Sequence, residues 1–310
     1  MSPPQTDTHP SVSVVLATYN RDISLCEAME SVFSQDYPGK IKLIVVDQSK
    51  DHNEEVRKFF RDHQDDFHYI FQPQPNLPKA ENTGLSAAKG ELIFFCADDW
   101  ILPSHAVSSL ARHFRPFRRQ VVAGVAVSEG DPERSLQDYA KGHGTDVIRQ
   151  TGLKKVRGFF FPVMLLPTEV VRAVGGYDDL MGDLTPTAAG EDHDFQYRLR
   201  LAKIPIFIDP SVHIVHKDHL AGGCATRCTD PQVARKYQIR SIAYMSAKYH
   251  GRVGLRGWIR VVRGYVLNRL TLSKGLPYVR SCFQAARSAV REAEAFIAAN
   301  KKQEFPPTRP

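Results

Sequence analysis

Short apolar runs rich in β-branched and aromatic residues recur through the first hundred residues of the chain. They cover residues 12–17, 41–46, 67–71 and 92–95. The polar stretches between these runs carry apolar residues at helical spacing, as in Leu25, Met29 and Val32. Strands that alternate with helices in this way predict an α/β fold, with a Rossmann-like, mostly parallel sheet flanked by helices.

The second half of the chain has a less regular pattern. An apolar run at 121–127 predicts one more strand, whereas the polar, glycine-containing stretch 128–155 predicts an irregular loop or a lid. Residues 190–203 open with acidic side chains and then show helical spacing, which predicts a helix. Residues 204–217 predict a strand, a turn and a second short strand, and residues 231–300 predict helices.

The composition is that of a soluble globular protein. The 310 residues are 42% hydrophobic and 24% charged. No apolar run of about 18 residues predicts a membrane span, and the first ten residues resemble a polar tail rather than a signal peptide. Five cysteines at irregular spacing argue for a reducing compartment, so we expect a cytoplasmic protein.

The net charge of +7 is divided unevenly along the chain. Residues 231–310 hold 16 Lys and Arg against 3 Glu and no Asp, a balance of +13. The remaining 25 basic and 31 acidic residues leave −6 for residues 1–230. This split suggests two physical roles, and we expect a disordered tail at 1–10, a main domain at 11–230 and a basic helical C-terminal extension after it.

Polar side chains directly follow three of the predicted strands. Thr18 and Tyr19 follow the first strand, Asp47 follows the second, and Asp98 and Asp99 follow the run at 92–95 closely. Ligands of open α/β sheets bind at the carboxyl ends of the strands, so these side chains are expected on one rim. The sequence contains no G-x-G-x-x-G, no G-x-x-x-x-G-K-[ST] and no G-x-S-x-G. A dinucleotide fold, the common phosphate loop and a hydrolase serine are therefore disfavoured.

Carboxylates dominate this rim. Asp47, Asp98 and Asp99, joined by Glu191 and Asp192 from the later helix, would repel one another in one crevice unless a cation lay among them. Oxygen ligands suit hard ions such as Mg²⁺ or Mn²⁺, which usually also bind substrate phosphates. The sequence thus predicts a divalent metal and a diphosphate. The alternatives are a solvated pair for Asp98 and Asp99, and helix capping for Glu191 and Asp192.

Six segments together resemble one known family. They read SVVLATYNR, IVVDQS, NTGLSAAKGELIFFCADDW, VGGYDD, GEDHDFQYRL and DPSVHIVH. Their order and spacing over residues 11–227 resemble family 2 glycosyltransferases of the GT-A fold. The segment HKDHLAGGCATR further resembles a bacterial subgroup with Gly-Gly-Cys after the last motif histidine. The resemblance implies that residues 11–230 form a catalytic domain that transfers a sugar, with inversion, from a nucleotide-diphosphate sugar to an acceptor hydroxyl.

The resemblance also implies donor-binding roles. Asp47 matches the acidic residue that binds the nucleoside base, with Thr18 and Tyr19 in the first loop beside it. Asp98 matches a contact to the ribose or the sugar. Glu81 stands where relatives often carry an arginine, and Lys79 is its substitute as the diphosphate contact.

Metal-binding and catalytic roles follow from the same resemblance. Asp99 matches the metal ligand of the D-x-D-like element, and His216 matches a histidine that completes the metal site. Asp192 matches the catalytic base. A neighbouring Glu191 would raise the pKa of one partner of this pair and so make it a better base near neutrality.

A zinc site is an alternative for the histidines near the end of this region. It would use His213, His216 and His219 with Cys224 and Cys228. The spacing matches no common zinc signature, and residues three apart on a strand point to opposite faces.

The basic extension allows three interpretations. Arg252, Arg256, Arg260 and Arg263 recur at helical spacing, and the apolar side chains of the neighbouring face follow the same period: Leu255, Trp258, Ile259, Val262 and Val266. A basic helix of this kind predicts a peripheral position on an anionic membrane surface. A helix packed on the main domain and a nucleic-acid patch are the other interpretations, although aromatic residues interleaved for base stacking are not evident.

Two rival functions remain open at this stage. One is a non-catalytic protein that binds sugar nucleotides or glycans with the same fold, and the other is a nucleotidyltransferase. A nucleotidyltransferase should carry a basic, glycine-rich phosphate loop near the first strand, which this sequence lacks. We therefore expect a metal-dependent glycosyltransferase that uses Mn²⁺ or Mg²⁺, with a polysaccharide or a lipid-linked saccharide as acceptor.

Overall fold

The computed structural model describes nine segments of the chain: residues 9–115, 118–143, 152–156, 163–185, 190–217, 223, 231–250, 253–267 and 269–300. Internal contacts divide the chain into two compact units. The first unit comprises Met1–Pro75, Ala80–Gly176 and Ala202–Gly223. The second unit comprises Asn76–Lys79, Tyr177–Leu201 and Cys224–Pro310. The domain boundary expected from the sequence after residue 230 stays a prediction.

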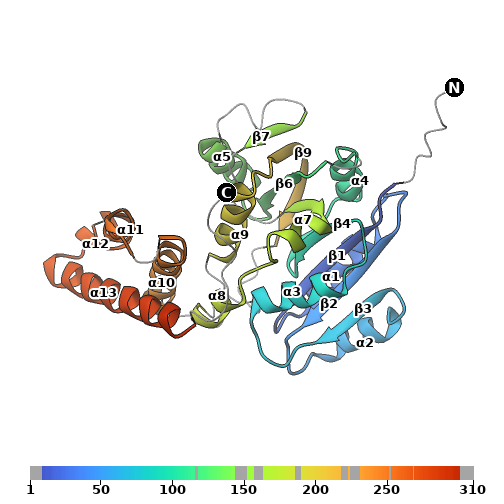
Figure 1. Cartoon of the computed structure of the whole chain (residues 1–310). Helices are drawn as coiled ribbons and strands as arrows, with labels where there is room; N and C mark the ends of the chain where they lie inside the picture. Colours follow the sequence, from blue (N-terminus) through green and yellow to red (C-terminus); the bar gives the residue numbers. More distant parts are fainter. Residues whose placement is uncertain are drawn as a thin grey trace. The chain divides into compact units, whose positions relative to one another are not determined.

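A nine-stranded mixed sheet forms the centre of the first unit (Figure 1). Its strands are β1 (Val12–Thr18), β2 (Ile41–Asp47), β3 (Phe67–Phe71), β4 (Leu92–Ala97), β5 (Trp100–Ile101), β6 (Val121–Ser128), β7 (Lys154–Val156), β8 (Met164–Pro167) and β9 (Ile206–His216). Their order is β3-β2-β1-β4-β8-β6-β9-β5, with β7 also paired to β9. Strands β3, β2, β1 and β4 are parallel, whereas β8 runs antiparallel to both of its neighbours.

Helices surround this sheet and build the second unit. They are α1 (Ile23–Phe33), α2 (Glu54–Asp62), α3 (Leu77–Ala87), α4 (Ala106–Ala111), α5 (Pro132–His143), α7 (Thr168–Ala173), α8 (Asp179–Leu184), α9 (Glu191–Leu201), α10 (Pro231–His250), α11 (Leu255–Val261), the π-helical η2 (Val262–Val266), α12 (Arg269–Leu272) and α13 (Leu276–Ala299). The expected α/β architecture with a central sheet and flanking helices is thus confirmed. Most described residues of the C-terminal stretch expected to be helical are helical, with breaks at 253–254, 267 and 273–275.

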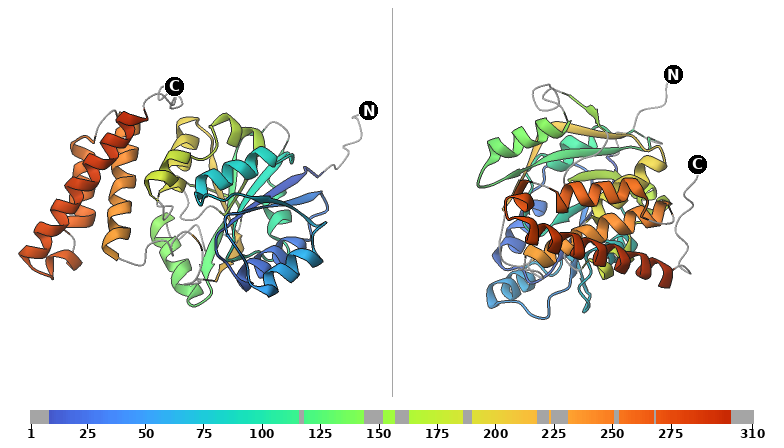
Figure 2. Two further views of the ribbon diagram at one scale, coloured as in Figure 1. Left: turned by 90° about the horizontal axis from the view of Figure 1, so that it is seen from below. Right: turned by 90° about the vertical axis from the view of Figure 1, so that its left-hand side faces the viewer.

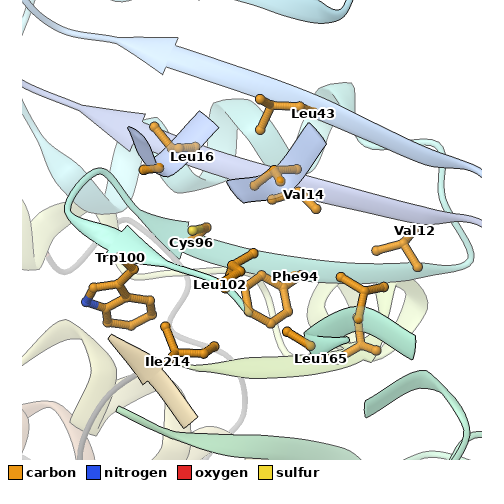
Figure 3. Close-up of a cluster of buried hydrophobic side chains, with 14 of the residues drawn as sticks. Val12, Val14, Leu16, Leu43, Phe94, Cys96, Trp100, Leu102, Leu165 and Ile214 are labelled. Atoms are coloured by element: carbon orange, nitrogen blue, oxygen red, sulfur yellow. The ribbon is translucent and has the colours of Figure 1, made fainter. Parts of the chain in front are cut away.

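Burial on both faces explains why the central strands are almost continuously apolar. Val14 and Phe94 point into a hydrophobic cluster (Figure 3). Leu25 of α1 belongs to the same cluster. On the opposite face, Val15 lies so close to Gly84 of α3 that a Cβ there would meet it at 2.3 Å. Parallel strands covered by helices on both faces need apolar side chains at every position, which is the pattern that the sequence shows.

The structure corrects the expectation of an irregular loop at 128–155. Helix α5 begins inside this stretch, and strand β7 closes it. Asp131 starts the helix, because its carboxylate accepts a hydrogen bond of 3.0 Å from the backbone N–H of Arg134. Asp131 followed by Pro132 and Glu133 is a sequence typical of a helix N-terminus. The prediction of a loop gave more weight to the glycines of this stretch.

The expected turn between two strands at 204–217 is also wrong. Residues 206–216 form the single strand β9, which pairs with β6 on both sides of an irregularity between Ala123 and Val125. Asp209 and Pro210 fall at this irregularity, and the Asp209 carboxylate accepts a hydrogen bond from the Ser211 N–H at 3.0 Å. A bulge of this kind absorbs a proline without ending the strand.

The second unit has its own hydrophobic core. Leu180 and Met181 of α8 pack with side chains of α10, the α11–η2 stretch and α13 (Figure 2). Trp258, Val262 and Val266, from the apolar face noted in the sequence, belong to this cluster. The α11–η2 stretch therefore docks through that face on helices of its own unit. None of the helices in the described segments is long and apolar enough to cross a membrane.

Candidate active site

The carboxyl ends of β1, β2 and β4 bring the predicted rim residues of the first unit together. Thr18 is paired with Asp47 in the β1–β2 register, and Ala97 next to Asp98 is paired with Ala17 of β1. Parallel strands in register end at one edge, so the polar residues that follow them share this edge. Asp47 is 0% exposed, and Asp98 and Asp99 are 6% and 5% exposed. The two acidic residues of the turn are therefore a buried pair rather than the solvated pair of the alternative interpretation.

Arg21 forms an ion pair with each carboxylate of this buried pair. Its Nε lies 2.9 Å from Asp98 Oδ1, and its Nη2 lies 2.5 Å from Asp99 Oδ2. Burial raises the pKa of Asp98, and the charge of Asp99 adds to this effect while Arg21 opposes it. Sequence reasoning gave Arg21 no role, although it lies only two residues after Tyr19 in the loop that follows β1.

His216 completes this part of the site. It ends β9 and is paired with Trp100 of β5, while the Lys217 N–H donates to the Asp99 carbonyl oxygen at 2.9 Å. This pairing places His216 Nε2 3.5 Å from Asp99 Oδ2. Trp100 is buried in the hydrophobic cluster, so an apolar anchor fixes the strand that follows the acidic turn.

The residues of this turn fit a divalent metal ion. The ligating atoms of Asp99 and His216 lie close enough together for one ion to take both as ligands, and a hard ion can fill its other positions with water and phosphate oxygens. Arg21 Nη2 forms an ion pair with this same Oδ2 of Asp99. The described segments contain no group of three or more histidine, cysteine, aspartate or glutamate side chains that could hold a metal. The alternative zinc site falls mostly on residues 219, 224 and 228, which lie outside the described residues.

The Gly-Gly-Cys segment contributes one described residue to the site. The Gly223 N–H donates a hydrogen bond of 2.7 Å to the Tyr19 carbonyl oxygen. Gly223 has a φ of +70°, and a Cβ on it would lie 2.7 Å from Arg21 Nη2. Only glycine combines this backbone conformation with so close an approach to the arginine. Gly223 thus lies against the first loop, next to the Arg21 guanidinium.

Asp47 is held by three donors. Its Oδ1 accepts from the Ser49 N–H at 2.8 Å, and its Oδ2 lies 2.9 Å from the Tyr69 hydroxyl and 2.7 Å from His52 Nε2. Burial alone would raise the pKa of Asp47, but the hydrogen bonds from His52 and Ser49 outweigh it and hold the pKa below its usual value. The same contact raises the pKa of His52. Sequence reasoning missed both His52 and Tyr69.

A pocket opens beside Asp47 with a volume of about 420 Å³. Its walls combine aromatic and basic side chains, among them His52, Arg57, Phe60, Tyr69 and Phe71. Tyr69 and Phe71 are 44% and 51% exposed, so their rings are available for stacking. An aromatic wall with nearby positive charge suits a flat, anionic ligand such as a nucleotide.

Glu191 and Asp192 begin helix α9 in the second unit. Glu191 is 7% exposed, and Glu191 Oε2 has no hydrogen-bond partner among the residues that the structure describes. Burial raises the pKa of Asp192 to about 7. Burial, with the charge of Asp192, raises the pKa of Glu191 well above its usual value. Gly190 precedes the helix with a φ of +101°, and a Cβ on it would lie 2.0 Å from Ser241 Oγ of α10.

Asp194 lies one turn further along the same helix and has a different environment. It is 0% exposed and accepts from Arg198 Nε, Lys248 Nζ and the Tyr249 hydroxyl at 2.8, 2.8 and 2.6 Å. Burial alone would raise the pKa of Asp194, but the charges of Arg198 and Lys248 outweigh it and lower the pKa. Lys248 Nζ also lies 2.7 Å from Asp178 Oδ2. The C-terminal helix α10 thus holds the first turn of α9 in place.

Lys79 belongs to the second unit as well. Its Nζ lies 3.1 Å from Asp183 Oδ1 of α8, and both side chains are about 40% exposed. Asn76 Nδ2 donates to the same Asp183 oxygen at 2.8 Å. The role of Lys79 at a diphosphate stays a prediction. The structure thus brings the predicted residues of the first unit together at the sheet edge, whereas Lys79, Glu191 and Asp192 belong to the second unit.

The comparisons with known proteins identify the family. The family model described as Glycosyl transferase family 2 matches residues 13–171, which is half of the chain and includes β1, β2 and the acidic turn. This chain belongs to glycosyl transferase family 2. It is 32% identical over 160 residues to the GalNAc(5)-diNAcBac-PP-undecaprenol beta-1,3-glucosyltransferase of Campylobacter jejuni. That match covers 50% of this chain and 51% of the relative, and the chain spans about half the length of the curated relatives that it matches first.

Two solved structures confirm the GT-A fold expected for the family member. S. aureus TarS, solved with UDP-GlcNAc, matches with a TM-score of 0.62 and 14% identity over 95% of this chain and 92% of TarS. The mannosyltransferase PcManGT of Pyrobaculum calidifontis, solved with GDP-Man and Mn²⁺, matches with a TM-score of 0.54 and 17% identity. That match covers 97% of this chain and 80% of the mannosyltransferase.

Proposed function

We propose that this chain is an inverting glycosyltransferase that moves a sugar from a nucleotide-diphosphate sugar to an acceptor hydroxyl, in polysaccharide or glycolipid synthesis. The observation that carries the proposal is the buried acidic turn after β4, where Arg21 and His216 face Asp98 and Asp99 in a chain of family 2. The contact of Gly223 with Tyr19 supports assignment to the subgroup with Gly-Gly-Cys after the last motif histidine.

The donor would lie along the carboxyl edge of the sheet. In this proposal the pocket lined by Tyr69 and Phe71 takes the nucleoside base, with Asp47 fixing the orientation of its wall. Thr18 and Tyr19 border the donor on the first loop, and Asp98 contacts the ribose or the sugar. Lys79 would bind the diphosphate after leaving Asp183.

Asp99 and His216 would hold Mn²⁺ or Mg²⁺, as the structure of PcManGT with GDP-Man and Mn²⁺ suggests by analogy. A bound divalent ion stabilises the negative charge that develops on a leaving diphosphate. Arg21 holds the two carboxylates in position and balances their charge, so that Asp99 keeps its orientation before the ion arrives.

Asp192 would act as the base. In its ionised form the carboxylate accepts the proton of the acceptor hydroxyl while that oxygen forms a bond to the anomeric carbon. The bond between this carbon and the diphosphate breaks, and its electron pair leaves with the diphosphate. A pKa raised to about 7 by burial suits this role, because a base is most effective when its pKa lies near the working pH. Glu191 lies beside it, and burial together with the charge of Asp192 raises the pKa of Glu191 well above its usual value.

The acceptor is a growing polysaccharide or a lipid-linked saccharide in this proposal. The name of the Campylobacter relative contains a saccharide linked to undecaprenol, which supports the second class. We further propose that residues 231–310 hold the enzyme at the cytoplasmic face of an anionic membrane, where such acceptors are displayed. The net charge of +13 in this part of the chain supports that location.

A donor screen tests the proposal. Calorimetry with UDP-, GDP- and dTDP-sugars, with and without Mn²⁺ or Mg²⁺, should find one donor whose binding the metal strengthens. Asp99→Ala should abolish this stimulation, because it removes the main hard-oxygen ligand. Product analysis on extracted glycolipids should then show transfer. Donor binding without any turnover would instead identify a non-catalytic sugar-nucleotide-binding protein.

A further inference from the structure

The segment from α11 to the start of α13 leaves large apolar side chains in solvent. Leu255 is 77% exposed, Ile259 45%, Leu267 50%, Leu272 52% and Leu276 82%. Five of the eleven exposed large hydrophobic residues in the described segments thus come from 22 consecutive residues, so they are concentrated in one part of the sequence. Single exposed leucines need no explanation, but a concentration of them marks an interaction surface.

Two of these side chains lie on one side of α11. Leu255 and Ile259 are one turn apart and point to solvent, whereas Trp258 and Val262 pack into the core of the second unit. The sequence placed all four on one apolar face. The structure divides this face into a buried part, which also includes Val266, and an exposed part, so core packing accounts for three of its five apolar side chains.

The exposed part is rich in positive charge. Arg256, Arg263, Lys274 and Arg280 are exposed, and residues 255–280 contain no aspartate or glutamate. Leu272 and Leu276 flank Lys274 where the chain turns from α12 into α13. Figure 2 shows α11 and α13 of this unit as the orange and red helices.

We infer that the exposed leucines and isoleucine of residues 255–276, together with the basic side chains among them, form a surface that docks on an anionic lipid bilayer. Apolar side chains next to arginines match a lipid interface, where the apolar groups enter the acyl boundary and the cations stay among the phosphates. A nucleic acid would match the charge but not the leucines. A second copy of the chain would have to cover an equally cationic surface.

This inference deepens the membrane association proposed above, and it does not require sugar transfer to occur. Vesicle binding and turnover therefore test the two separately. The full chain is sedimented with vesicles of phosphatidylcholine alone and with vesicles that also contain phosphatidylglycerol, at low and physiological salt. The wild type should bind the anionic vesicles, and its binding should weaken with salt because screening acts within about 8 Å at physiological ionic strength.

Two sets of substitutions separate the apolar from the ionic part. The triple variant Leu255→Gln, Ile259→Gln and Leu276→Gln should lower the partition coefficient on anionic vesicles at least about tenfold while keeping the salt dependence. The second set, Arg256→Gln, Arg263→Gln and Lys274→Gln, should lower it by a similar factor and flatten the salt dependence.

Matched controls use exposed apolar residues elsewhere in the second unit. Leu201 and Val233 are 38% and 37% exposed, and Leu201→Gln with Val233→Gln should leave vesicle binding unchanged. Circular dichroism melting checks the fold of every variant. All substituted positions are exposed, so unfolding of the triple Gln variant would show that these leucines belong to the core and would overturn the inference.

Three further results would also overturn it. The first is equal sedimentation of the wild type and the triple variant with anionic vesicles. The second is a triple variant that changes its oligomeric state in light scattering but binds vesicles as well as the wild type. The third is a wild type that binds RNA tightly and in a salt-dependent way but does not bind vesicles. Turnover of a small soluble acceptor should be the same in the wild type and in both variant sets. If neither the wild type nor the variants turned over any acceptor while vesicle binding followed the expected pattern, the proposed function would be refuted. The docking surface would still be supported.

Discussion

Two acidic regions of this chain use their carboxylates in different ways. At the sheet edge of the first unit, one arginine holds both Asp98 and Asp99. At the start of α9 in the second unit, Asp194 is bound by three donors, whereas Asp192 two residues earlier has a pKa raised to about 7. In the first region, one arginine compensates the charge of two carboxylates. In the second region, several donors bind the single carboxylate of Asp194.

In the proposed function, this difference separates a carboxylate pair that binds a cation from a carboxyl group that transfers a proton. A carboxylate pair balanced by a single arginine keeps a strong negative potential, which favours a divalent ion. A carboxyl group with a raised pKa exchanges a proton near neutral pH, which favours a base. Arg198 and Lys248 lower the pKa of Asp194, so Asp194 stays ionised. Its contacts with α10 hold the helix turn that carries Asp192.

The largest expected effect comes from removing the proposed base, Asp192. Asp192→Asn keeps the shape of the side chain but cannot accept a proton, so kcat should fall by about 10²–10⁴ with little change in donor affinity. Stopped assays of product with the preferred donor measure the first quantity, and calorimetry measures the second.

The pH dependence sharpens the same prediction. The base works when it is ionised, so kcat of the wild type should rise with pH through an apparent pKa near 7. The two carboxyl groups influence each other, so this value belongs to the pair of Glu191 and Asp192. Glu191→Gln should retain most of the activity. If Asp192→Asn had near-normal turnover and Glu191→Gln were inactive, Glu191 rather than Asp192 would be the base.

The next largest effect concerns the buried ion pairs that hold Asp194 of α9. Lys248 is 3% exposed in its side chain and lies between Asp178 and Asp194. Lys248→Met leaves two carboxylates without this cation, and breaking a buried pair in this way costs about 3–5 kcal/mol. The free energy of unfolding, measured in urea, should fall by this amount.

A matched control lies on the same helix. Lys236 pairs with Glu292 at 2.8 Å, but both side chains are 33% exposed, so Lys236→Met should cost less than about 1 kcal/mol. Equal losses in the two variants would show that burial does not distinguish the two ion pairs. The contrast drawn between the carboxylates of α9 would then lose its basis.

The sequence predicted most of the elements that build the site. Apolar runs predicted β1, β2, β3 and β4, and the acidic start with helical spacing predicted α9, because these signals are local. The position of the acidic turn at the sheet edge followed from the rule for ligand sites in α/β sheets.

Partners distant in the sequence could not be predicted in the same way. Arg21 meets Asp98 across 77 positions, and Lys248 meets Asp194 across 54. No local pattern encodes such contacts, since they depend on how strands and helices pack. The same limit explains why the sequence could not divide the apolar face of 255–266, where Trp258 is packed and Leu255 is exposed.

The smallest expected effect tests a third carboxylate, Asp47, which is ionised and fully partnered like Asp194. Its contact with His52 raises the pKa of the histidine above the ordinary 6.5 and lowers that of the aspartate below 3.8. The histidine contribution to stability is complete below about pH 6.5 and is lost as the pH rises through the raised pKa of His52. The aspartate contribution is present above about pH 4 and is lost as the pH falls through the lowered pKa of Asp47.

Stability should therefore depend on this pair most strongly between these limits. His52→Gln should lower the free energy of unfolding by about 1.5 kcal/mol at pH 5.5, because it removes a hydrogen bond between charged groups. At pH 8.5 the loss should be smaller than at pH 5.5, because the histidine gives up its proton as the pH rises through its raised pKa. Tyr69→Phe removes a different donor from the same carboxylate oxygen, and Tyr69 stays neutral at both pH values because its pKa is raised. Its cost should be the same at both. A pH-independent cost for His52→Gln would mean that the histidine is neutral in the folded protein, and Asp47 would then owe its lowered pKa to Ser49 rather than to an ion pair.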